Sequence, residues 1–155
     1  IYERLLNEMY GPLRRNDYRI EYNVRNFNLE EARELIRTNP KLLSQNEMYQ
    51  VAGSYAKDSK EYREAMEIAA RTYPDDPVAL GNAAATCLAA KDARGAIALL
   101  EGKKLDAAAM NTLGVAYAEV GEYQKAKSTL EKAANEGNAD AKGNLEQVIK
   151  VIEQL

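Results

Sequence analysis

The paired acidic residues are the side chains of this sequence best suited to catalysis, because the chain contains no histidine. Glu30-Glu31 and Asp75-Asp76 could share the work of a general acid and a general base. Both pairs, however, stand at the start of segments with helical periodicity, where carboxylates stabilise the helix dipole. No phosphate-binding loop, dinucleotide fingerprint or G-x-S-x-G motif accompanies them. We therefore expect a protein that is not an enzyme.

The remaining reactive side chains do not form a recognisable metal, cofactor or nucleic-acid site. Cys87 is the only cysteine, so without histidine the chain cannot build a Cys/His zinc site. Basic residues interleaved with aromatic ones can bind single-stranded nucleic acid. Such residues occur early in the chain, namely Arg14, Arg15, Tyr18, Arg19, Tyr22, Arg25 and Phe27. Asp17 and Glu21 interrupt them and the net charge is −3, so we expect no metal, no cofactor and no nucleic-acid partner.

The composition predicts one helical domain. The length of 155 residues suits a single domain, and 46% hydrophobic with 29% charged residues is usual for a folded chain. Abundant Ala, Glu, Lys and Leu favour helices over sheets. No apolar run approaches the ~18 residues needed to span a bilayer, so we expect no direct membrane insertion. Because the chain opens with Ile1 inside a helical pattern, we expect it to be part of a longer protein.

Helical periodicity recurs along the chain at a nearly constant interval. One helix is expected between Asp106 and Gly121 and a second between Gly121 and Gly137, which together form a helix-turn-helix pair. The pattern also occurs 30 residues earlier, where Asp76 is the expected N-cap. It occurs again 31 residues before that, after a capping box that starts at Ser44. Repeats of this period are typical of helical solenoids.

The last of these units resembles the tetratricopeptide repeat. It contains Leu113-Gly114-x-x-Tyr117 and then Ala126-x-x-x-Leu130, where the family has Leu-Gly-x-x-Tyr and Ala-x-x-x-Phe in a unit of about 34 residues. In the middle unit Ala84 and Cys87 replace the glycine and the tyrosine. The shorter spacing of the earlier units implies second helices that are about one turn shorter. The resemblance covers residues 46–140 and implies a right-handed solenoid of paired helices.

Close packing at a helix crossing would explain why Gly114 stands in the middle of an expected helix. Such a glycine costs about 1 kcal/mol relative to alanine, and close packing of the two helices would offset that cost. In each unit a small residue of the first helix is expected to meet a small residue of the second. The pairs are Gly53 with Ala65, Ala84 with Ala96, and Gly114 with Ala126.

In tetratricopeptide arrays the first helices line a concave surface that binds peptides or extended segments. The resemblance assigns to this surface the candidate groove residues Gln50, Ser54, Lys57, Val78, Ala85, Leu88, Asn111, Val115 and Ala118. Small apolar residues replace the Lys/Asn clamp with which some members hold a C-terminal carboxylate. A shallow apolar groove bordered by Asn111 and Glu119 suits an apolar or helical ligand. Alternatively, the small residues only allow the superhelix to curve tightly.

Single helices are expected on both sides of the repeats. A lone helix capped by Asn28 would pack under the first unit as a half unit. After Asn138 the chain begins like another first helix without a second one, and its apolar stripe predicts a terminal helix that covers the last hydrophobic face. The stripe consists of Leu145, Val148, Ile149, Ile152 and Leu155. An alternative is that this helix is amphipathic and forms a dimer.

The start of the chain contains the only strand-like alternation, near residues 18–26. A single strand is not stable alone, so it would pair with an upstream sheet, pair with another copy, or lie against the helices as an arm. Residues 1–27, with a helix, a Gly11-Pro12 break, Arg14-Arg15 and this strand, are similar to the end of an OmpA-like peptidoglycan-associated domain. That resemblance implies a periplasmic or cell-envelope protein, although nothing here corresponds to the family's cell-wall-binding residues. Alternatively, residues 1–27 are an amphipathic lead-in that contains two arginines.

These patterns predict an all-α solenoid of three tetratricopeptide-like units, with a preceding half unit, a capping helix and one short extended segment near 18–26. The units are expected at about 46–76, 77–106 and 107–140 and the cap at 141–155, within a repeat domain of residues 28–155 that follows the remnant 1–27. The expected function is a non-catalytic interaction module of a larger protein that binds a protein or peptide segment on its concave face. The alternative is a structural spacer or assembly module that packs against its own upstream domain.

Overall fold

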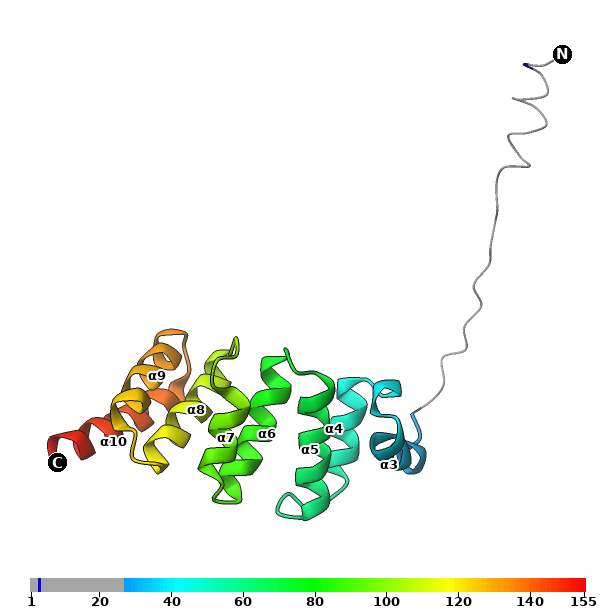
Figure 1. Cartoon of the computed structure of the whole chain (residues 1–155), viewed down its shortest axis with the longest axis horizontal. Coiled ribbons are helices and arrows are strands. Elements are labelled where there is room, and N and C mark those ends of the chain that lie inside the picture. Colours follow the sequence, from blue (N-terminus) through cyan, green and yellow to red (C-terminus); the bar gives the residue numbers. More distant parts are fainter. Residues whose placement is uncertain (1–2, 4–26) are drawn as a thin grey trace.

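The chain forms an elongated row of helices in the computed structural model (Figure 1). The structure describes Glu3 and residues 27–155, and every regular element between residues 27 and 155 is helical. The predicted all-α class is therefore confirmed for this part of the chain. The extended segment expected at 18–26 and most of the OmpA-like segment at 1–27 lie outside the described residues.

The described helices follow one another as packed pairs with short connections. Helix α4 packs on α5, α6 on α7 and α8 on α9, while α3 packs on α4 and α10 packs on α9. Contacts of α5 with α6 and of α7 with α8 join each pair to the next. The bounds are α3 Leu29–Thr38, η2 Pro40–Leu42, α4 Gln45–Gly53, α5 Lys60–Thr72, α6 Pro77–Ala89, α7 Ala93–Leu100, α8 Ala107–Glu119, α9 Tyr123–Asn135 and α10 Ala139–Glu153.

Local capping interactions determine where these helices begin and end. Ser44 and Glu47 form the predicted capping box at α4, and the Asp76 carboxylate accepts a hydrogen bond from the Ala79 N–H at the start of α6. Gly121, between α8 and α9, has a φ of 83°, which only glycine adopts readily. The predicted helix starts and stops are thus confirmed at these positions.

The core is built mainly from alanine, which allows neighbouring helices to approach closely. The larger side chains of Leu100 and Leu130 are fully buried between the helices. At Gly114 a Cβ atom would lie 2.5 Å from the Cγ atom of Leu130, so α8 and α9 could not cross at this distance with alanine there. The predicted close crossing at Gly114 is confirmed, but the atoms it faces belong to Leu130 rather than to Ala126.

The predicted register of the first unit is wrong by one residue. Gly53 is exposed, and a Cβ atom there would meet nothing within 4 Å, whereas Ala52 is fully buried. Ala52, Ala84 and Gly114 each lie eight positions after the N-cap of their helix, so Ala52 occupies the crossing position. The prediction was wrong because it aligned the units by their glycine residues. The residue at the helix crossing is instead determined by its distance from the start of the helix.

The predicted shortening of the second helices is confirmed for one unit and wrong for another. Helix α7 has 8 residues, but α5 has 13, the same as α9. In the first unit it is the first helix, α4, that is short, with 9 residues. At the other end, Val148 of the predicted stripe is buried while Leu155 is 88% exposed, so the packed stripe does not extend to Leu155.

Candidate binding groove

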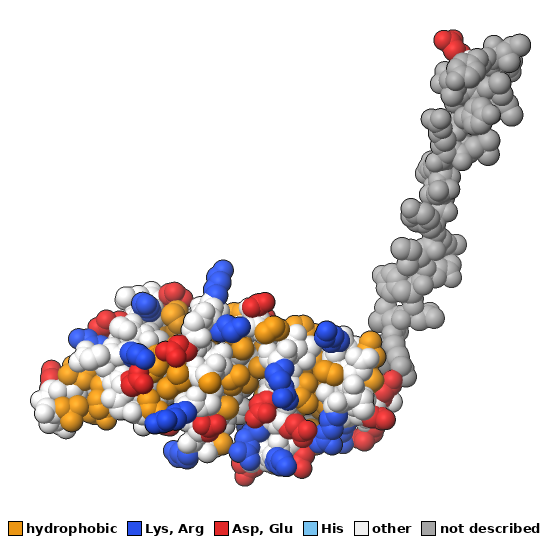
Figure 2. All heavy atoms as spheres, in the orientation of Figure 1, with side chains coloured by type: hydrophobic (Ala, Val, Ile, Leu, Met, Phe, Trp, Pro, Cys, Tyr) orange, Lys and Arg blue, Asp and Glu red, His pale blue; other side chains and the backbone are white. Residues whose placement is uncertain are grey.

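A groove of about 340 Å³ opens between the last three helices, α8, α9 and α10. We call it the terminal groove. Its apolar residues are Val115, Ala118, Tyr123, Leu130, Val148 and Val151, and its polar residues are Glu119, Asn144 and Gln147. Figure 2 shows hydrophobic side chains on the surface at the α10 end of the row. Val151 is 37% exposed beside the groove, so apolar surface there is open to a ligand.

The groove exists because α10 does not pack on α8 as tightly as α8 packs on α6. Gly81 permits the close contact of α6 and α8, since a Cβ atom there would lie only 3.2 Å from the Cβ atom of Ala109. In the next unit the residue at this position is Asn111, 30 residues later. The Oδ1 atom of Asn111 accepts a hydrogen bond of 2.9 Å from Nδ2 of Asn144 on α10. A polar side chain thus stands between α8 and α10 where glycine lets α6 and α8 touch.

A second substitution between units enlarges the same space. Leu88 on α6 packs against the core, and the corresponding residue of α8, 30 positions later, is Ala118. Alanine lacks the three outer carbon atoms of leucine. The terminal groove therefore lacks an aliphatic side chain that the chain itself supplies one unit earlier.

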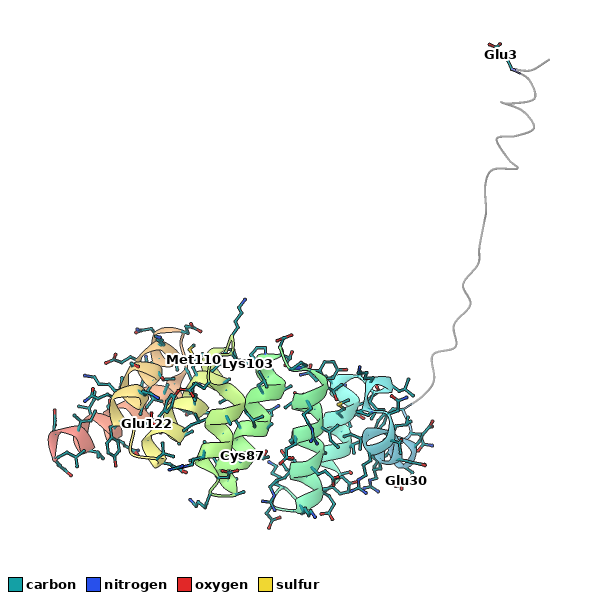
Figure 3. The ribbon with its side chains drawn as sticks, in the orientation of Figure 1. Glu3, Glu30, Cys87, Lys103, Met110 and Glu122 are labelled. Carbon is teal, nitrogen blue, oxygen red and sulfur yellow. The ribbon has the colours of Figure 1, made fainter. Side chains whose placement is uncertain are left out.

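A polar cluster around Tyr117 holds α8 in place. The Tyr117 hydroxyl donates a hydrogen bond of 2.7 Å to Oε1 of Glu101, and the Lys125 ammonium lies 5.1 Å from the centre of the tyrosine ring. Lys125 also pairs with Glu122, which lies between α8 and α9 (Figure 3), at 2.7 Å. Burial, and then the hydrogen bond to Glu101, raise the pKa of Tyr117 to about 12. The Tyr117 hydroxyl therefore keeps its proton, and with it this hydrogen bond, well above physiological pH. The bond links α8, which contains Val115 and Ala118, to Glu101 at the end of α7.

The structure brings together some of the candidate groove residues and separates others. Val115 and Ala118 line the terminal groove, and Asn111 bonds to Asn144 at its edge. Lys57 lines a different hollow, of about 310 Å³. The Ser54 hydroxyl accepts a hydrogen bond of 3.2 Å from Nε of Arg33 and so lies against α3. The others, Gln50, Val78, Ala85 and Leu88, line neither hollow.

Sequence reasoning missed the wall of the groove that α10 supplies. Of the α10 residues that line the groove, Val148 was expected only as part of a covering helix. The others, Asn144, Gln147 and Val151, were not singled out. A signal was nevertheless present, because Asn138 caps α10 as Asp106 caps α8, 32 residues earlier. The sequence already indicated that this segment begins like another first helix, and first helices were the ones expected to line the groove, but the groove assignment stopped at α8.

One member of each acidic pair, Asp76 and Glu30, has a structural contact near a helix start. Asp76 caps α6, and the hydrogen bond from the Ala79 N–H lowers the pKa of its carboxyl group. Glu30 accepts a hydrogen bond of 2.8 Å from Arg33 on the same helix. Among the described residues, no cluster of three or more His, Cys, Asp or Glu side chains could hold a metal ion. Within the same residues, no helix combines the length and the apolar character needed to cross a membrane.

A comparison with protein families finds no matching family, and a search of curated proteins finds no relative.

Proposed function

We propose that this chain is a non-catalytic protein-interaction module that binds an apolar segment of a partner in the terminal groove. The main support is the groove itself, which is apolar, partly open and bordered by a few polar groups. Its volume of about 340 Å³ lies at the lower end of the range for ligand pockets, about 300–1,000 Å³. A groove of this size suits a short peptide segment with one or two anchoring side chains better than an extended chain that runs along the whole array.

The proposed architecture is a right-handed solenoid of tetratricopeptide-like units. The support for it comes from the three successive helix pairs and from the crossing residues Ala52, Ala84 and Gly114, which recur at one position after each N-cap. A location in a larger cell-envelope protein is a further proposal, and it depends only on the resemblance of residues 1–27 to an OmpA-like domain.

A substitution that fills the groove tests the proposed function. Ala118→Leu restores the side chain that Leu88 supplies one unit earlier, so it should close the groove while the chain stays folded. Ala108→Leu is the matched control, because Ala108 is an exposed residue of the same helix and does not line the groove. Short peptides selected from a displayed random library on the unmodified chain should bind the control and fail to bind Ala118→Leu. Equal binding to both variants would show that the terminal groove is not the site.

The spacer function is a second candidate because apolar residues are also exposed at the opposite end of the row. A hollow of about 260 Å³ lies between α3, η2 and α4, and Phe27 and Leu42 beside it are 38% and 66% exposed. A neighbouring domain or segment that packs on this end would cover them. Hydrogen exchange of the α3 and η2 amides should then be slower in residues 1–155 than in residues 27–155. Equal exchange in both chains would count against packing of residues 1–26 on this surface.

A further inference from the structure

The terminal groove has a one-sided charge distribution. Among the described residues that line it, Glu119 is the only charged one. All the α8 residues that line the groove, and all the α10 residues except Asn144, lie in the C-terminal half of their helix. The negative ends of two helix dipoles therefore lie on the side of the groove. The helix of opposite direction, α9, begins after Glu122, but the Glu122 carboxylate is already paired with Lys125 at 2.7 Å, so it adds no net negative charge to the groove. Glu119 and the C-terminal ends of α8 and α10 would therefore stabilise a cationic group of a ligand.

The repeat indicates which side chain the apolar part of the groove would accept. Leu88 occupies the position on α6 that Ala118 occupies on α8, and Leu88 packs against the core. A ligand that places an aliphatic side chain over Ala118 would restore this packing. Glu119 directly follows Ala118, so a basic residue next to the anchor would be positioned to pair with its carboxylate.

On the basis of the proposed function, we propose that the terminal groove selects a basic segment of a partner protein, with a leucine-sized aliphatic anchor over Ala118 and a neighbouring Lys or Arg paired with Glu119. The aliphatic anchor supplies affinity through burial. The ion pair at the partly exposed edge supplies specificity and sensitivity to salt. An acidic segment with the same anchor would bind more weakly.

Peptide selection on the full chain tests this inference separately from the proposed function. Peptides enriched on the unmodified chain, and lost on Ala118→Leu, should share an aliphatic residue next to Lys or Arg. Enrichment that depends on the groove but shows no basic bias, or no aliphatic anchor, would overturn the inference and leave the proposed function standing. Absence of any enrichment that depends on the groove would overturn both.

Charge reversal at Glu119 provides a second test with defined probes. The best selected peptide and a version with its basic residue replaced by Glu are compared by fluorescence anisotropy on the unmodified chain, Glu119→Gln and Glu119→Lys. Glu119→Lys should bind the basic peptide with about tenfold lower affinity than the unmodified chain does, and it should bind the acidic version more tightly. The affinity of Glu119→Gln for the basic peptide should lie between those of the unmodified chain and Glu119→Lys. Added salt should reduce the differences in affinity among the three chains. An unchanged preference for the basic peptide on Glu119→Lys would overturn the inference.

Discussion

Gly114 and Gly143 both lie inside α-helices, but only Gly114 faces another helix at close range. A Cβ atom on Gly114 would lie 2.5 Å from Cγ and 2.7 Å from Cδ2 of Leu130, whereas a Cβ atom on Gly143 would meet nothing within 4 Å. The same substitution, glycine to alanine, should therefore have different effects on stability at the two positions. Gly143→Ala is the matched control for Gly114→Ala.

The size of the difference follows from two opposing contributions. Each substitution improves helix propensity by about 1 kcal/mol, so Gly143→Ala should raise the free energy of unfolding by about that amount. At Gly114 the new methyl group overlaps the side chain of Leu130, which is fully buried. Overpacking of this kind costs about 1–3 kcal/mol. Gly114→Ala should thus be neutral to destabilising, and the two variants should differ by about 1–3 kcal/mol.

Urea unfolding followed by circular dichroism measures both free energies. In a chain of this size a change of 1 kcal/mol corresponds to about 2–4 °C in Tm, so thermal unfolding should show the same order. Leu130→Ala should cost less in the Gly114→Ala background than in the unmodified chain, because it makes room for the added methyl group. If Gly114→Ala stabilises the protein as much as Gly143→Ala does, the close crossing of α8 and α9 is not present in solution.

Three further predictions follow from burial and from local electrostatics. Leu130→Ala should lower the free energy of unfolding by about 2–5 kcal/mol, while Leu155→Ala, at an 88% exposed position, should change it by less than about 0.5 kcal/mol in the same urea titration. Tyr117 has its pKa raised from 10.0 to about 12, so the folded state holds this proton more tightly and its contribution to stability is complete below pH 10. That contribution should decline between pH 10 and 12, and the decline should be absent from Tyr117→Phe when unfolding is measured across this range. Burial, and then the negative charge of Asp92, raise the pKa of the Cys87 thiol. A thiol reagent should therefore modify Cys87 more slowly in the folded chain than in urea. Equal rates of modification would contradict the burial of Cys87.

The positions of most helices could be predicted because their ends depend on neighbouring residues. Ser44 and Glu47 cap each other across one turn, and Gly121 supplies the positive φ between α8 and α9. These interactions span only a few residues, so they are visible as short motifs. The error at Gly53 arose from matching residue types between units. Counting from the caps would have identified Ala52, since the cap determines which residues face the next helix.

The candidate site could be predicted only in part. The resemblance to tetratricopeptide repeats identified Val115 and Ala118 on α8, and both line the terminal groove. The opposite wall, with Val148 and Val151, comes from a helix that sequence patterns presented as a cover for the core. A periodic apolar stripe shows that a helix packs on something, but it does not show at what distance or against which neighbour.

The sequence by itself determined the helices, their caps and the recurring small residues, because backbone hydrogen bonding and capping act within one or two turns. Only the tertiary structure decided that a groove opens at one end of the row. Its width depends on the hydrogen bond between Asn111 and Asn144, which lie 33 residues apart. The groove also depends on Ala118, whose small side chain leaves space only because α9 and α10 enclose it. Such distances between helices arise when all the side chains pack together, so no single segment of the sequence contains them.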